Sequence, residues 1–217
     1  MEAFRIQQAM AIVRDEVKTM PGKFIRADRR AFRGELLSPA GQKELLEAIN
    51  DGSYRVAPGF PFTIKKRDGS PRPSLSLRLN DRIYYTASVL ECLQAIVRPG
   101  SGPRFQGYAG KIERLATGGL ETFDGVSQLK EFLGFGSAPA PAAGKILRAD
   151  IAGFYPAIRH EVLQTALLNL GVGEEKISNI LDSLKTWMAG APAGLPQTFW
   201  ASDMLAEAVL RPGGGDQ

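Results

Sequence analysis

A short apolar run in the second half of the chain, residues 145–151, constrains the fold most strongly. A segment rich in Gly, Ala and Pro, residues 136–144, precedes this run, and Pro156 follows it. An apolar run of this length between chain breakers is typical of a buried β-strand. The pattern therefore predicts a strand that has Asp150 at its end and delivers one carboxylate there.

The composition predicts a soluble globular protein. With 217 residues, of which 44% are hydrophobic, the chain is large enough to form one or two domains with a core. It contains no apolar stretch of about 20 residues that could cross a bilayer, and its first residues lack the apolar segment of a signal peptide. We therefore expect a cytoplasmic protein without a membrane partner.

Cysteine and histidine are too scarce for several kinds of site. The single cysteine, Cys92, excludes an intramolecular disulfide, and its apolar neighbours predict a position in the core. The single histidine, His160, leaves almost no material for a zinc site or a Ser-His-Asp arrangement, and we expect it to cap or pack the helix that follows. Any metal chemistry would therefore depend on carboxylates.

Basic residues are concentrated in the first half of the chain. Residues 1–100 hold 17 Lys or Arg against 11 Asp or Glu, whereas residues 101–217 hold 10 against 12. This surplus favours a phosphate-rich partner, although a solvated basic surface is the alternative. Four arginines spaced three and four apart would lie along one face of a helix, where they could contact a nucleic-acid backbone. They are Arg26, Arg29, Arg30 and Arg33.

Hydrophobic periodicity predicts that most of the regular structure is helical. The predicted helices cover residues 2–20, 38–49, 80–97, 126–133, 160–170, 174–188 and 202–210. Ser38 and Pro39 are typical of an N-cap and of the first position inside a helix.

Strand-like alternation occurs in residues 62–66 and 74–79, on either side of a turn, and predicts a β-hairpin with a basic tip. Its cationic side chains could close over a triphosphate, or could serve only to keep an edge strand from aggregating. They are Lys65, Lys66, Arg67 and Arg72.

Three stretches, in this order, resemble the prokaryotic reverse-transcriptase family, which includes group II intron, retron and phage-defence enzymes. The first is the hairpin Ile64-Lys65-Lys66-Arg67-Asp68-Gly69-Ser70-Pro71-Arg72, with Asp81-Arg82-Ile83 opening the next helix. The second is Asp150-Ile151-Ala152-Gly153-Phe154-Tyr155-Pro156-Ala157-Ile158-Arg159-His160, similar to the family's Asp-Ile-x-x-Phe-Phe/Tyr-x-Ser-Ile-x-His with Ala157 in place of Ser. The third is Gly194-Leu195-Pro196-Gln197-Thr198 with Ser202, similar to the family's Leu-Pro-Gln-Gly motif with Thr198 in place of Gly.

The resemblance implies an α+β fold with the fingers and part of the palm of a right-handed polymerase. It divides the chain into an N-terminal helical basic region, a fingers-like hairpin with helices, a linker or loop, a partial palm and a disordered tail. These parts are residues 1–53, 54–135, 136–144, 145–211 and 212–217. The family's third motif, an aromatic-x-Asp-Asp hairpin, does not follow Ser202 and Asp203, so the palm is expected to be truncated before this motif.

The implied reaction is RNA-directed DNA synthesis, a template-directed nucleotidyl transfer that uses two metal ions. Its partners would be an RNA template, a DNA or RNA primer and deoxynucleoside triphosphates, with Mg²⁺ or Mn²⁺ as the cofactor. Mg²⁺ prefers carboxylate and phosphate oxygens, which makes Asp150 the expected catalytic residue and metal ligand. The carbonyl of Ile151 would be a second metal ligand.

The resemblance also implies roles for other side chains. Tyr155 would pack under the sugar of the nucleotide and reject a 2′-hydroxyl by volume, although a core aromatic is the alternative. Lys66 and Arg72 would contact the triphosphate, and Gln197 would contact nucleotide and template. Lys65 and the four arginines would bind nucleic acid.

Alternatives to a complete enzyme remain open. The chain could be a nucleic-acid-binding module without catalysis that uses its basic half, or a split-enzyme subunit completed by a second polypeptide. An unrelated α+β scaffold protein would have no affinity for RNA.

Overall fold

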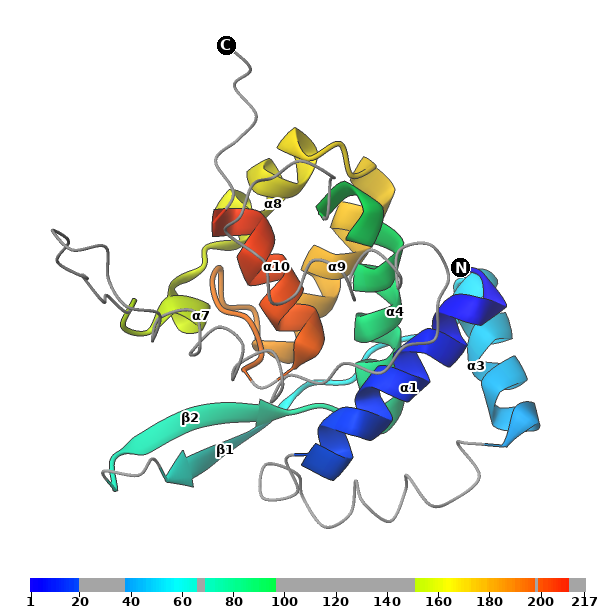
Figure 1. The fold of residues 1–217 in the computed structure, drawn as a ribbon, viewed down its shortest axis with the longest axis horizontal. Helices are drawn as coiled ribbons and strands as arrows, with labels where there is room; N and C mark the ends of the chain where they lie inside the picture. Colours follow the sequence, from blue (N-terminus) through cyan, green and yellow to red (C-terminus); the bar gives the residue numbers. More distant parts are fainter. Residues whose placement is uncertain (20–37, 66–68, 97–150, 198, 211–217) are drawn as a thin grey trace, which may run out of the picture.

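The computed structural model describes residues 1–19, 38–65, 69–96, 151–197 and 199–210. These residues form helices and one two-stranded antiparallel sheet, which is an α+β structure in the general sense (Figure 1). The elements are α1 (Ala3–Thr19), α3 (Pro39–Asn50), β1 (Phe60–Lys65), β2 (Pro71–Ser76), α4 (Leu79–Ile96), α7 (Phe154–Ala157), α8 (His160–Asn169), α9 (Glu174–Trp187) and α10 (Trp200–Leu210).

Six of the predicted helices and the hairpin are confirmed within a few residues at each end. The short helix α7 was not predicted, because Pro156 indicated a break. Pro156 is the third residue of α7, in a first turn whose amide groups need no partner inside the helix, so proline is tolerated there. Several predictions lie outside the described residues: the helix at 126–133, the arginine stripe, the linker and the tail. Of the predicted buried strand at 145–151 only Ile151 is described, and this residue is exposed and outside any strand.

Helix α4 is the centre of the helical body. It contacts α1, α9 and α10, and most of its side chains are buried (Figure 1). A helix that is apolar on nearly all sides is expected in the middle of a core. Cys92, in the fourth turn of this helix, is buried among these residues, as its neighbours predicted.

The hairpin extends from the helical body (Figure 1). Three prolines take part in its pairs, namely Pro61 with Leu75, Thr63 with Pro73, and Lys65 with Pro71. These three prolines belong to every second residue pair of the hairpin. Since antiparallel strands exchange hydrogen bonds on every second pair, the pairs between the prolines can supply the amide donors.

The N-cap of α3 is the one predicted from Ser38 and Pro39. Ser38 has an extended backbone, and its Oγ accepts a hydrogen bond of 3.1 Å from the amide of Gly41. Replacing Ser38 with alanine is expected to lower the free energy of unfolding by about 1 kcal/mol, because one amide of the first turn loses its acceptor. Urea unfolding of this variant beside Ser38→Asp, which keeps a capping oxygen, would measure the loss. Equal losses in the two variants would contradict the capping role.

Candidate functional site

Two stretches that carry the resemblance are bonded to each other. The segment from Tyr155 to His160 lies along the loop at residues 192–195, and the two form an isolated antiparallel bridge. The amide of His160 donates to the carbonyl of Pro192 at 2.9 Å, the amide of Gly194 donates to the carbonyl of Ile158 at 2.8 Å, and the amide of Leu195 donates to the carbonyl of Tyr155 at 3.1 Å. The structure therefore places the second and third stretches side by side.

The side chain of His160 adds a further contact between these two stretches. It is buried as the first residue of α8, and its Nε2 lies 3.0 Å from the carbonyl oxygen of Gly194. A carbonyl only accepts, so Nε2 carries the hydrogen in this contact. The predicted packing role is therefore extended by the structure, because His160 packs its own helix and also holds the loop.

Tyr155 is fixed at both ends. Its carbonyl is bonded to Leu195, and its hydroxyl donates a hydrogen bond of 2.6 Å to Oδ1 of Asp203 in the first turn of α10. Its ring lies edge-on to the ring of Phe154, with 5.8 Å between the centroids. Tyr155 is half-buried at the border of the core, so it is accessible on one side.

Asp203 was not among the predicted site residues. Its position after the loop indicated a carboxylate that either faces solvent or neutralises the first turn of a helix. It does lie in that turn, but it is half-buried and accepts the hydroxyl of Tyr155. The two residues are 48 positions apart, so no helical or strand spacing could indicate the pair.

The first turn of α10 is held in place by α1 and α4. Oε1 of Glu16, in α1, accepts a hydrogen bond of 2.5 Å from the amide of Trp200, which begins α10. The hydroxyls of Ser202 and Tyr85 are 3.0 Å apart, which joins the same turn to α4. Glu16 thus acts as an N-cap supplied from the other end of the chain.

Glu16 also forms a buried ion pair with Arg82. Oε2 of Glu16 is 3.2 Å from Nη2 of Arg82, whose side chain is 2% exposed and whose guanidinium lies 4.6 Å from the centroid of Phe199. Burial raises the pKa of Glu16 to about 7, although Arg82 and the Trp200 amide pull it down and the charge of Asp203 adds to the rise. Arg82 belongs to the matched Asp81-Arg82-Ile83, but its partner in α1 could not be inferred from that motif.

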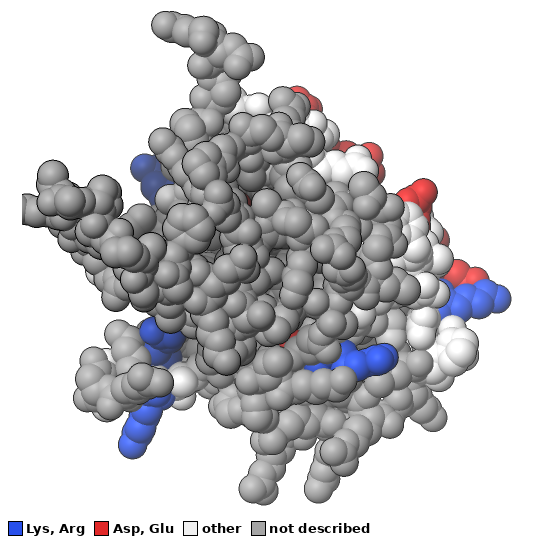
Figure 2. All heavy atoms as spheres, viewed as in Figure 1, with Lys and Arg blue, Asp and Glu red and all other residues white. Residues whose placement is uncertain are grey.

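The predicted basic residues of the hairpin face different sides. Arg72 pairs with Ile64, and Lys65 pairs with Pro71. Directly paired residues point to the same face and neighbours along a strand point to opposite faces, so Arg72 and Lys65 lie on opposite faces. Both side chains are exposed. Figure 2 shows Lys and Arg atoms at this end of the molecule, and further Lys and Arg atoms beside the Asp and Glu atoms along the opposite edge.

The remaining predicted site residues are only partly described. Ile151 is 58% exposed, and Gln197 is half-buried in the loop that follows Leu195. Outside the described residues lie Asp150, Lys66, Arg26, Arg29, Arg30 and Arg33. In the part of the chain that is described, no three His, Cys, Asp or Glu side chains come together as a metal site. The described residues thus do not form the predicted Mg²⁺ site among themselves.

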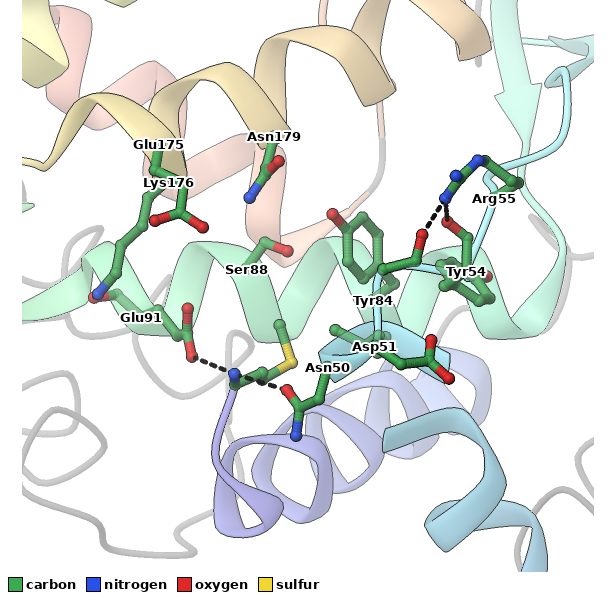
Figure 3. Close-up of a pocket in the computed structure, with 13 residues that line it drawn as sticks. Asn50, Asp51, Tyr54, Arg55, Tyr84, Ser88, Glu91, Glu175, Lys176 and Asn179 are labelled. Carbon is green, nitrogen blue, oxygen red and sulfur yellow. Dashed lines mark hydrogen bonds and ion pairs between the residues drawn. The ribbon is translucent and has the colours of Figure 1, made fainter. Parts of the chain in front are cut away.

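A separate polar recess of about 630 Å³ lies between α3, α4 and α9 (Figure 3). Acidic and basic side chains line it together, among them Asp51, Arg55, Glu91 and Lys176. The ammonium group of Met1 donates a hydrogen bond of 2.8 Å to Oδ1 of Asn50 there and lies 4.0 Å from Glu91. None of the predicted site residues lines this recess, so it is distinct from the site at Tyr155.

Comparison with family models, with characterised proteins and with solved structures found no match. Within the described ranges, none of the helices combines the length and the apolar character that crossing a membrane would require.

Gly194 occupies a backbone conformation that favours glycine. Its φ is 109°, and a Cβ there would lie 2.7 Å from Cε of Met188. Replacing Gly194 with alanine is therefore expected to lower the free energy of unfolding by about 1–3 kcal/mol. Chemical unfolding measures the loss. Gly190→Ala is the matched control, because Gly190 also has a positive φ but has open space around its Cβ position. An equal loss in both variants would show that the contact with Met188 adds nothing.

Proposed function

We propose that the chain is a reverse-transcriptase-type nucleotidyltransferase domain, with fingers and a partial palm. It would add deoxynucleotides to a DNA or RNA primer on an RNA template, with Mg²⁺ or Mn²⁺ as the cofactor. The proposal rests on the three matched stretches in their order along the chain. Asp150 would be the catalytic metal ligand together with the carbonyl of Ile151, and when bound the metal would stabilise charge on the phosphoryl group.

One observation carries the proposal furthest. The matched stretch that begins at Asp150 is joined to the matched loop that contains Gly194 and Leu195. Hydrogen bonds from residues 155–160 form this contact. Residues that act on one nucleotide must meet in space, and these two stretches do so although more than 30 residues separate them. The contact supports a shared site for Tyr155 and Gln197.

The described side chains suit the handling of a nucleotide. Tyr155 is held by hydrogen bonds at its backbone carbonyl and at its ring hydroxyl, and its ring is half-buried, as suits a group that tests the shape of a sugar. Arg72 is an exposed guanidinium on one face of the hairpin, where it would bind phosphate oxygens through paired hydrogen bonds. Lys65, on the other face, would contact the nucleic-acid backbone.

Primer extension tests the proposal. The chain is incubated with a primed RNA template, dNTPs and Mg²⁺, beside Asp150→Ala and the control variant Asp182→Ala, whose carboxylate is exposed on α9. We expect incorporation by the wild type and by Asp182→Ala and none by Asp150→Ala. Incorporation that survives Asp150→Ala would refute the assignment of the site.

A second candidate is a nucleic-acid-binding module or split-enzyme subunit that needs another polypeptide for catalysis. The exposed Lys65 and Arg72 on the hairpin favour it, because backbone binding requires only accessible positive charge. This candidate predicts RNA binding that weakens steeply with salt, without incorporation in the assay above. The absence of both would leave an unrelated α+β scaffold.

A further inference from the structure

We propose that Asp203 is a positioning residue for nucleotide selection, which holds the ring of Tyr155 in the orientation that excludes a 2′-hydroxyl. This inference rests on the proposed function. It assigns a role to Asp203, a residue for which the resemblance implied none. It begins from the 2.6 Å hydrogen bond between the Tyr155 hydroxyl and Oδ1 of Asp203. A distance of 2.6 Å is typical of a hydroxyl that donates to an ionised carboxylate, which is a stronger bond than one between neutral groups.

A ring can reject a hydroxyl by volume only if the ring stays in place. An aromatic side chain turns about χ1 between staggered wells, so a ring anchored at its backbone alone can swing aside. Tyr155 is anchored at its backbone by the amide of Leu195 and at its far end by Asp203. Two anchors at opposite ends of the residue restrict that rotation.

Asp203 can serve as an anchor because its own position is fixed. Trp200, three residues earlier, is capped by Glu16, and the neighbouring Ser202 is bonded to Tyr85 of the central helix. Asp203 also lies in the first turn of α10, where the helix dipole favours its ionised form. The ring of Tyr155 is thereby connected to α1 and α4 through the beginning of α10.

The test is the ratio of kcat/KM for a deoxynucleotide to kcat/KM for the matching ribonucleotide, measured by single-nucleotide incorporation on an RNA template. Tyr155→Phe removes only the hydroxyl, and Asp203→Ala removes only its acceptor. Each is expected to lower the ratio about tenfold, which corresponds to about 1.4 kcal/mol. The double variant should lower it no further, because both changes break one bond. Asp203→Asn, whose amide oxygen can still accept, should restore most of the ratio.

A matched pair elsewhere controls for a general loss of stability. The hydroxyl of Tyr54 donates a hydrogen bond of 2.7 Å to Oδ1 of Asp81, away from the site. Tyr54→Phe removes the same kind of bond and should leave the ratio unchanged. If the wild type incorporates nucleotides but Tyr155→Phe and Asp203→Ala keep its ratio, the role of Asp203 is refuted and the proposed function stands. If the wild type incorporates no nucleotide, both proposals fail.

Discussion

Replacing Glu16 with alanine is expected to lower the free energy of unfolding at pH 8 by about 3–5 kcal/mol. The reason is the environment of Arg82, which is 2% exposed and would keep its charge without the carboxylate at 3.2 Å. A buried guanidinium does not lose its proton, so the desolvation of the charge loses the offset that Glu16 provides. The amide of Trp200 would lose its acceptor in the same variant. Unfolding in urea, followed by circular dichroism, measures the change.

A double-mutant cycle separates the ion pair from the rest of this effect. Arg82→Met removes the positive charge, and the double variant Glu16→Ala, Arg82→Met removes both charges of the pair. The double variant should therefore lose less stability than the sum of the two single variants. Glu47→Ala is the control, since its ion pair with Lys43 is exposed and should contribute less than about 1 kcal/mol. Additive losses in the cycle would show that Glu16 and Arg82 do not stabilise each other.

Stability should also fall as the pH rises through neutrality, because of the same carboxyl group. The pKa of Glu16 is about 7 in the folded protein, against an ordinary value of 4.5. Between these values the folded state holds a proton that the unfolded state has released, so this contribution is complete below pH 4.5 and is lost as the pH passes 7. Its size is on the order of 3 kcal/mol, from a pKa difference of about 2.5 at about 1.4 kcal/mol each.

Glu16→Gln isolates this contribution, because glutamine does not titrate and its oxygen can still accept from the Trp200 amide. Urea unfolding at pH 5, 6, 7 and 8 should show wild-type stability falling relative to the variant by the amount above. Other titrating groups, including Asp81, whose pKa burial also raises, are common to both proteins and cancel in the difference. A difference that stays constant with pH would mean that the pKa of Glu16 is ordinary in the folded protein.

The first turn of α10 contains or contacts three residues that these predictions change, namely Glu16, Tyr155 and Asp203. Glu16 caps this helix, Tyr85 is bonded to Ser202 within it, and Asp203 extends from it to Tyr155. Weakening the support from α1 should therefore affect the candidate site as well as the stability. Under the proposed function, pH-dependent stability and nucleotide selection would share one structural element.

Local patterns were sufficient for most of the regular structure that the described residues show. Hydrophobic periodicity predicts the helices and the burial of Cys92, and turn residues predict the hairpin. These features can be predicted because they depend on neighbours a few positions away in the sequence. The N-cap at Ser38 is found for the same reason. The motifs also predicted that Tyr155 and Gln197 act on one nucleotide, and this role stays a prediction.

The partners of buried polar groups required the folded structure. Glu16 and Trp200 are 184 residues apart, Tyr85 and Ser202 are 117 apart, and Tyr155 and Asp203 are 48 apart. Periodicity shows that a side chain faces the core, but it carries no information about which distant group lies opposite. Those pairings depend on how α1, α4 and α10 pack, and packing alone brings Asp203 to Tyr155 and makes Glu16 the cap of α10.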